Sequence, residues 1–394
     1  MAEKDKLKIV EFCDNFFPQI DGVVRVVDNC AKHLNRIGEC EVVVPQYHED
    51  YKAWDDKLPY KVLRKKAKIK IVNKFIIPLP RKDKELNKYL LNSNADIFHV
   101  HSPFFIGHYA LKLAKKKKIP VIATFHSQFK EDVMAQTHNK LITNFAVSYI
   151  VKFFNKCDEV WAPSKKAAET LRSYGYKKNV FVMENGTNFI YPHNSDELKN
   201  IAIDKFSINQ NAKNLLYVGQ LRYVKNLKLV LKTINELVKI DPAYHMYFVG
   251  EGLDEQSMRE FVKKNNLINN VHFLGKINDV ALLSGVYAAC DLFFFPSTYD
   301  TFSIAVRESC TMKTPCLLTK ESNAAEPFKD GINGYLANET VEDMKNKIIE
   351  IFSNPEQMTK VGITSSNTIP ISFEVMSNRT YTRYQEIIEK FNKK

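Results

Sequence analysis

The chain has 394 residues, of which 45% are hydrophobic and 26% charged, a composition typical of a globular protein with room for two domains. Its net charge is +12, and the whole excess lies in the first half: residues 1–190 hold 33 Lys and Arg against 21 Asp and Glu, whereas residues 191–394 hold 24 of each. No apolar run reaches the roughly 18 residues of a transmembrane helix, and the first residues contain no apolar signal-peptide core. The seven cysteines form no CxxC pair, so we expect small buried thiols in a reducing cytoplasm.

Strand-like apolar runs alternate with helical patterns through the first half of the chain. The expected strands are residues 8–12, 41–45, 97–100, 120–124 and 159–163, and the expected helices are residues 24–37, 107–117 and 144–156. This alternation is typical of βαβ units, and it predicts a parallel, doubly wound sheet.

The same pattern starts again after a polar segment. The expected elements are strands at 214–218, 244–249, 271–274, 292–295, 315–318 and 334–336, with helices at 227–239 and 373–391. We therefore predict an α/β fold of two Rossmann-like domains, residues 1–190 and 214–372, with a linker at 191–213 and a terminal helix within 373–394.

A phosphate site is predicted after the apolar strand at 292–295. The backbone amides of Phe302, Ser303 and Ile304 fall at the start of the helix that follows this strand. Unpaired amides and the positive end of the helix dipole make such a position suitable for phosphate.

Two carboxylates accompany those amides. Asp300 lies in the loop and Glu308 in the helix, and both suit the hydroxyls of a sugar or a ribose. An N-capping Asp and an ordinary surface Glu would give the same pattern, so the motif alone leaves both interpretations open.

The spacing of these carboxylates resembles the acidic-x7-acidic motif of the family 4 retaining glycosyltransferases, which have the GT-B fold. The family pattern is Glu-x7-Glu, so Asp300 is a conservative departure at its first position, whereas Glu308 matches. Further landmarks occur in the family's order over nearly the full length. The resemblance implies two Rossmann-like domains facing across a cleft, with the last helix crossing back to the first domain.

Gly22 follows the first strand and precedes the first helix. Glycine at such a place lets a backbone approach a ligand closely. The resemblance implies contact with the donor pyrophosphate or the acceptor, and a simple turn glycine is the alternative. No GxGxxG follows this strand, which argues against a dinucleotide oxidoreductase.

His126 follows the strand at 120–124, at the end where open α/β sheets bind ligands. The resemblance implies contact with the donor sugar and the reaction centre, for which a neutral imidazole suffices. A satisfied structural histidine is the alternative. His99 and His101 flank a similar strand end and are weaker candidates, and the His and Asp spacing predicts no metal site.

The stretch after strand 214–218 resembles the family's Gly-Arg-Leu-x-x-Glu-Lys-Gly, whose Arg and Lys neutralise the diphosphate leaving group. Lys225 matches the Lys, but Gln220 stands at the Arg position and supplies no charge. Arg222, two residues later, is the alternative cation for this role. A surface lysine is the alternative for Lys225, although positive charge at a helix start is unfavourable without an anion.

The resemblance implies a retaining hexosyltransferase that uses UDP-glucose or UDP-galactose. The nucleotide-sugar is a co-substrate, so no cofactor is expected, and the lack of a DxD motif predicts metal independence. His126 and Lys225 would act by positioning and by stabilising diphosphate charge. The turns with Gly250 and Lys276 would line the uridine side of the donor site.

The acceptor is less certain, and the segment 124–129 with the basic first domain looks most like bacterial diacylglycerol glycosyltransferases. This resemblance predicts a glycolipid acceptor and a peripheral location on the inner face of the cell membrane. The basic clusters at 64–70, 81–84 and 115–118 suit an anionic membrane surface, although they also fit a lysine-rich solvated face. The apolar residues of 141–154 could add to membrane contact, but helical spacing of this kind is more typical of core.

One partner is excluded and two alternative functions remain. Nucleic acid is not expected, because no base-reading or aromatic-interleaved motif accompanies the basic clusters. The runner-up activity is a glycosyltransferase that builds a capsular or cell-wall polysaccharide. A catalytically silent GT-B protein that binds sugar or scaffolds a partner is also possible, because Gln220 and Asp300 depart from the family pattern.

Overall fold

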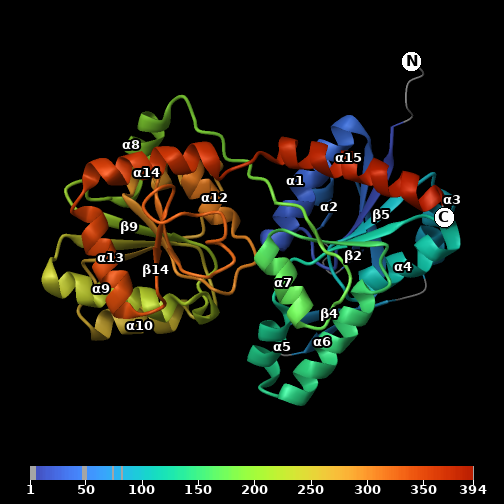
Figure 1. The fold of residues 1–394 in the computed structure, drawn as a ribbon, viewed down its shortest axis with the longest axis horizontal. Coiled ribbons are helices and arrows are strands. Elements are labelled where there is room, and N and C mark those ends of the chain that lie inside the picture. Colours follow the sequence, from blue (N-terminus) through green and yellow to red (C-terminus); the bar gives the residue numbers. More distant parts are fainter. Residues whose placement is uncertain (1–5, 47–50, 73–74, 81–82, 394) are drawn as a thin grey trace. The chain divides into compact units, whose positions relative to one another are not determined.

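The computed structural model describes residues 6–46, 51–72, 75–80 and 83–393. The chain divides into two compact units, one formed by residues 1–186 together with 373–394 and the other by residues 187–372 (Figure 1). The last helix, α15 (Phe373–Asn392), thus belongs to the first unit. The segment 191–213, which we expected to be a linker, contains helix α8 (Ser195–Phe206), which packs on α11 (Val280–Ala289) in the second unit.

The first unit is built on an eight-stranded sheet with the order β4-β3-β2-β1-β5-β6-β7-β8. Its strands are β1 (Lys8–Phe12), β2 (Glu39–Gln46), β3 (Lys61–Val72), β4 (Phe75–Pro80), β5 (Ile97–Val100), β6 (Val121–Thr124), β7 (Glu159–Ala162) and β8 (Phe181–Val182). Every neighbouring pair is parallel except β3 and β4, which are antiparallel. The central strands β1, β5 and β6 are apolar and buried, as a parallel sheet with helices on both faces requires.

The helices of the first unit are α1 (Gly22–Ile37), α2 (Lys52–Asp55), α3 (Lys84–Asn92), α4 (Phe105–Lys117), α5 (Phe129–Thr137), α6 (Lys140–Phe154), α7 (Lys165–Ser173) and α15. Helix α1 shows why they form where they do. Asp21 caps it by accepting a hydrogen bond from the Val24 amide at 2.9 Å, and its apolar face, with Val27 and Leu34, is buried. It packs against β2 and α15.

The second unit has a six-stranded parallel sheet with the order β11-β10-β9-β12-β13-β14. Its strands are β9 (Lys213–Val218), β10 (Tyr244–Val249), β11 (Val271–Gly275), β12 (Leu292–Phe295), β13 (Cys316–Thr319) and β14 (Tyr335–Ala337). Besides α8 and α11, its helices are α9 (Leu227–Ile240), α10 (Glu255–Lys264), α12 (Ile304–Thr311), α13 (Val341–Phe352) and α14 (Pro355–Thr368). The chain runs outward from β9 to β11 and then returns to β12 on the other side of β9. The predicted class of two doubly wound α/β units is confirmed, and β9 and β12 form a topological switch point.

The basic run at 64–70 lies in strand β3, an element that we did not predict. The Arg64 guanidinium binds both oxygens of Asp55, at 2.6 and 3.0 Å, and its side chain is only 6% exposed. Arg64 therefore does not face a membrane, contrary to our expectation for this cluster. The side chains of Lys68 and Lys70, and all of Arg81 and Lys82, lie outside the described residues. The seven cysteines are buried free thiols, as expected.

Candidate active site

The predicted site residues fall into two groups, one in each unit. In the second unit, the loops after β9 and β12 emerge at the same sheet edge, because these parallel strands are neighbours. Lys225 follows β9 in a short 3-10 turn, Tyr223–Lys225, and its Nζ forms an ion pair with Oδ1 of Asp300, which follows β12. Ser297 donates a hydrogen bond to the other Asp300 oxygen at 2.5 Å. The tertiary structure thus joins two residues that sequence reasoning had proposed separately.

The surroundings of this pair explain the neighbouring candidates. Tyr217 donates a hydrogen bond to the Gln220 carbonyl at 3.2 Å, and burial, followed by the charge of Asp300, raises the pKa of Tyr217 well above its usual value. The phenol therefore stays neutral and fixes the loop. The Gln220 side chain itself is exposed, and Arg222 is half-buried.

Gly250 and Lys276 have less specific surroundings. Gly250 has a positive φ of 134°, and a Cβ there would lie 2.0 Å from the Gly219 carbonyl oxygen. The close approach of the β9 and β10 loops therefore requires this glycine for the fold alone. Lys276 follows β11 with an exposed side chain.

Helix α12 begins directly after Ser303, where we predicted a phosphate site. Ser303 has a φ of 61°, unusual for a residue other than glycine, and no side chain caps the helix. Phe302 is buried, and its carbonyl accepts a hydrogen bond from Arg307 in the next turn. The start of α12, at Ile304, thus carries no acidic residue in its first turn and no side-chain cap among the described contacts, as an anion site at a helix start requires.

The two carboxylates of the motif have different partners. Glu308 is 4% exposed and accepts a hydrogen bond from the Tyr287 hydroxyl at 3.0 Å. Asp300 binds Lys225 and Ser297 and does not cap α12. The alternative of a capping Asp with an ordinary surface Glu is therefore wrong.

In the first unit, Gly22 is the first residue of α1. Its position is exposed, and a Cβ there would meet no atom within 4 Å. Its φ is not in the left-handed range, so the fold does not demand glycine at this residue. The open space in front of the α1 amides agrees with a backbone that approaches a ligand.

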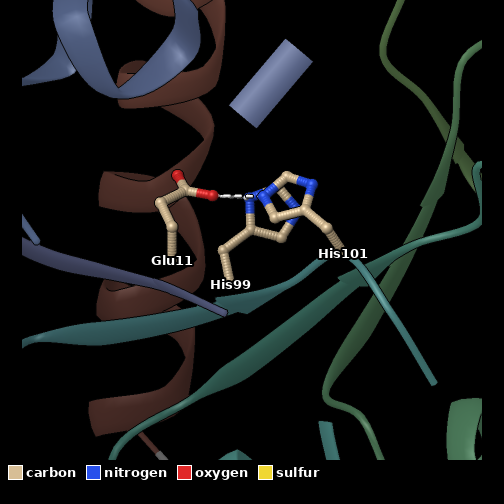
Figure 2. A group of neighbouring side chains, drawn as sticks. All are labelled: Glu11, His99 and His101. Atoms are coloured by element: carbon tan, nitrogen blue, oxygen red, sulfur yellow. Dashed lines mark hydrogen bonds and ion pairs between the residues drawn. The ribbon is translucent and has the colours of Figure 1, made fainter. Parts of the chain in front are cut away.

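His126 belongs to a buried polar chain at the carboxyl ends of β1, β5 and β6. Its Nε2 lies 2.8 Å from Nδ1 of His101, and Nε2 of His101 bonds to Oε2 of Glu11. Figure 2 shows the Glu11 carboxylate pointing at the histidine rings. Sequence reasoning ranked His101 low and missed Glu11, although a carboxylate inside an apolar strand was a signal, because a buried charge needs a partner.

The proton positions follow from this chain. A carboxylate oxygen accepts, so Nε2–H of His101 donates to Glu11, and in a neutral imidazole Nδ1 of His101 then accepts. His126 then donates to His101 through Nε2–H, which makes Nδ1 its acceptor nitrogen. Burial, and then the proximity of His101, lowers the pKa of His126 well below its usual value, so this ring is neutral.

His99 links the same cluster to helix α15. Its Nδ1 lies 2.6 Å from the Tyr384 hydroxyl and its Nε2 lies 2.7 Å from Oγ1 of Thr124. Tyr384 in turn donates to Oε1 of Glu11 at 3.2 Å. Both nitrogens of His99 are therefore engaged, as in a structural histidine.

One ligand atom each from Glu11, His99 and His101 lies within 4.8 Å of the others, a spacing that could hold a metal ion. These atoms already make hydrogen bonds to one another, to Tyr384 and to Thr124. The side chains are thus satisfied without an ion, and metal independence stays a prediction.

Comparison with protein families covers most of the chain. The model of "Glycosyltransferase Family 4" matches residues 20–189, and that of "Glycosyl transferases group 1" matches residues 199–367. The matched segments contain the candidate residues of the first and the second unit, respectively.

Among curated proteins, the chain is 24% identical to the alpha-monoglucosyldiacylglycerol synthase of Acholeplasma laidlawii, over 98% of this chain and 99% of that protein. It is 26% identical to the enzyme of the same name from Streptococcus pneumoniae, over 79% of this chain and 70% of that protein. Among solved structures, Anabaena Alr3699/HepE in complex with UDP and glucose has a TM-score of 0.76 at 14% identity, with 96% of this chain and 100% of that chain covered. Sucrose-phosphate synthase from Thermosynechococcus elongatus has a TM-score of 0.77 at 16% identity, with 98% and 100% covered. These likenesses confirm the predicted fold.

Proposed function

Because the chain belongs to the family 4, group 1 glycosyltransferases, we propose that it is a retaining, metal-independent transferase that moves a hexose from a UDP-sugar to a membrane glycolipid acceptor such as diacylglycerol. The observation that carries the proposal is the Lys225–Asp300 ion pair at the switch point of the second unit. It places a cation beside the start of α12, where a diphosphate gains from both charge and amides.

Donor binding would exchange one anion for another. In the structure Lys225 is neutralised by Asp300, and both side chains are largely buried, at 13% and 17% exposure. A UDP diphosphate would take over the Lys225 ammonium, and Asp300 would then turn to a sugar or ribose hydroxyl. Charge that develops on the leaving phosphate is stabilised by Lys225 and the α12 amides, so no metal is invoked. Complexes of the neighbour HepE with UDP and with UDP-glucose support this donor class.

The neutral His126 would orient the sugar. Its ring follows β6 and is held by His101, which in turn bonds to Glu11. A hydrogen bond to a sugar hydroxyl requires no proton transfer, which suits a reaction in which the departing phosphate accepts the acceptor's proton.

Membrane docking is proposed for helix α6, whose apolar residues are unexpectedly exposed. Leu141 is 81% exposed, Phe145 77%, Ile142 50% and Tyr149 44%, although helical spacing had favoured a buried position. These four side chains, the α6 face, lie on one side of the helix, and residues 140–156 contain Lys140, Lys152 and Lys156 but no acid. A basic helix with an exposed apolar face fits the interface of an anionic bilayer. No helix in the described part of the chain is long and apolar enough to span a membrane.

Transfer is tested with purified protein, UDP-glucose or UDP-galactose, and diacylglycerol in mixed micelles. We expect UDP release that depends on diacylglycerol, together with a glycosyl-diacylglycerol of retained anomeric configuration. Activity that is unchanged by EDTA would support metal independence. UDP binding without turnover on any lipid would favour a silent protein, and turnover only on soluble glycans would favour the polysaccharide activity.

Docking is tested by sedimentation with vesicles of phosphatidylcholine, with or without phosphatidylglycerol. We expect binding to the anionic vesicles alone, weakened by high salt. Leu141→Ser should reduce this binding, whereas Leu253→Ser, a change at a leucine that is 74% exposed in the second unit, should not. An equal loss of vesicle binding in Leu141→Ser and Leu253→Ser would contradict the role of the α6 face.

A further inference from the structure

A hollow of about 390 Å³ lies in the first unit, among α3, α4, α6 and β3. None of the described residues that line it is acidic. Its polar lining comprises Lys65, Asn87, His108, Tyr109, Lys112, Lys116 and Tyr149. The rest of the lining is apolar. None of these residues belongs to the donor group of the second unit or to the Glu11 cluster. The lining therefore has the charge of an anion site without a known occupant.

Lys65 places a buried positive charge in the hollow. It is only 3% exposed, and its ammonium lies 3.8 Å from the centroid of the Tyr109 ring. Within the described residues, no oxygen accepts a hydrogen bond from it. Burial lowers the pKa of Lys65, and the charge of Asp83 opposes this shift. The two Asp83 oxygens accept hydrogen bonds from the backbone amides of Lys66 and Leu86, at 3.2 and 3.1 Å. A buried ammonium of this kind is costly unless an anion joins it.

His108 supplies an unpaired buried polar atom of the hollow. Its Nε2 is buried and has no hydrogen-bond partner among the described residues. The ring is held against α6, with centroids 5.0 Å from Tyr149 and 5.2 Å from Phe153. Unpaired buried nitrogens are rare in native proteins, so this atom, in a hollow that Lys65 also lines, points to a missing ligand.

We infer that this hollow binds a phosphoester, with the phosphate held by Lys65, Lys112, Lys116 and His108 and the organic part against the apolar lining. A phosphate alone would leave most of the volume empty, whereas small-molecule sites typically measure roughly 300–1,000 Å³. Tyr149 belongs both to the hollow and to the α6 face. The phosphoester could therefore belong to a lipid headgroup, and this version of the proposal rests on the proposed membrane docking. Binding of a soluble phosphoester does not depend on docking.

Calorimetric titration of the full chain with sn-glycerol 3-phosphate tests the site without any transferase assay. Lys112→Gln and Lys116→Gln should each weaken binding about tenfold, since each removes one charge-assisted hydrogen bond. Lys115→Gln is the matched control, because it removes the same charge from an exposed position of α4 outside the hollow. Lys65→Met should abolish binding, and circular dichroism of this variant checks its fold.

A second arm distinguishes the source of the phosphoester. Lys112→Gln should weaken flotation with phosphatidylglycerol vesicles more than Lys115→Gln does if a headgroup enters the hollow. A soluble source is indicated if Lys112→Gln weakens glycerol 3-phosphate binding but floats with the vesicles as well as Lys115→Gln does. Absence of binding in both arms, or equal effects of Lys112→Gln and Lys115→Gln in both, would overturn the site. Neither result depends on cleavage of the UDP-sugar, so failure of this site would not contradict the proposed transferase activity.

Discussion

Lys225 is the residue whose replacement should most directly affect turnover. Lys225→Met removes the cation beside α12 while the methylene stem is kept, so we expect kcat to fall by about 10²–10³-fold, as for the loss of one transition-state donor. Lys232→Met, at an exposed lysine of α9, is the control. The rate of UDP release at saturating UDP-glucose is measured for both variants. Equal rates in Lys225→Met and Lys232→Met would contradict the leaving-group role of Lys225.

The buried histidines make stability depend on pH. Burial, and then the nearby His101 and His126, lowers the pKa of His99 well below its usual value. A histidine in the unfolded chain has a pKa of about 6.5, so below that pH the unfolded chain binds more protons than the native chain. The free energy of unfolding should therefore fall as pH drops below about 6.5, by at most about 1.4 kcal/mol per pH unit from this residue, and should not change above it on this account.

Denaturant unfolding between about pH 5 and 7 checks this expectation. His99→Gln should make the pH slope smaller, even if the variant is less stable at every pH. His193→Gln, at an exposed position, should leave the slope unchanged. A slope that His99→Gln does not alter would show that other groups cause the pH dependence.

Single residues also show how far sequence reasoning reaches. His126 was identifiable because it follows a predicted strand, where ligands bind in open α/β sheets. Its hydrogen-bond partner His101 comes from another strand, and Glu11 from a third. Which strands are neighbours is not written in any local pattern, so the chain of three residues was not predicted.

At the scale of elements, the start of α1 offers a test that separates function from stability. Gly22→Ala adds a methyl group that meets no protein atom within 4 Å. Alanine is the better helix former by up to about 1 kcal/mol, so Tm should stay unchanged or rise. If the α1 amides approach the donor or acceptor, the added methyl group should nevertheless raise KM severalfold. Unchanged kinetics would return Gly22 to the interpretation of a simple turn glycine.

Helix α6 and strand β3 show two different failures of local patterns. The α6 sequence is apolar on both sides, with Ile150 and Phe154 buried and Leu141 and Phe145 exposed. Periodicity predicts the helix, but it cannot tell which apolar side faces the core. In β3, the frequent lysines concealed a strand that pairs with β2 on one side and with the edge strand β4 on the other.

At the scale of the whole molecule, the chain returns to the first unit after completing the second. Tyr384 of α15 is a buried polar link to that unit, since its hydroxyl binds both Glu11 and His99. Tyr384→Phe leaves these buried groups each without one partner, which should cost about 1–3 kcal/mol.

Hydrogen exchange locates that loss. Amides of β1 and β5 should exchange faster in Tyr384→Phe, whereas those of β9 and β12 should not, because the second unit has its own core. Tyr191→Phe, which removes an exposed hydroxyl of the second unit, should change stability by less than about 0.5 kcal/mol. Equal acceleration in both units would show that they unfold as one cooperative body.

The sequence by itself determined the alternation of strands and helices, the two doubly wound units and the family landmarks, because periodicity, helix starts and strand ends are local properties. Only the tertiary structure decided which side chains meet. Lys225 and Asp300 are 75 positions apart, and Glu11 and His101 are 90 apart. Such contacts depend on the order of strands in a sheet, and the exposure of α6 depends on what packs beside it. Both are set by the packing of the whole unit and by no single segment.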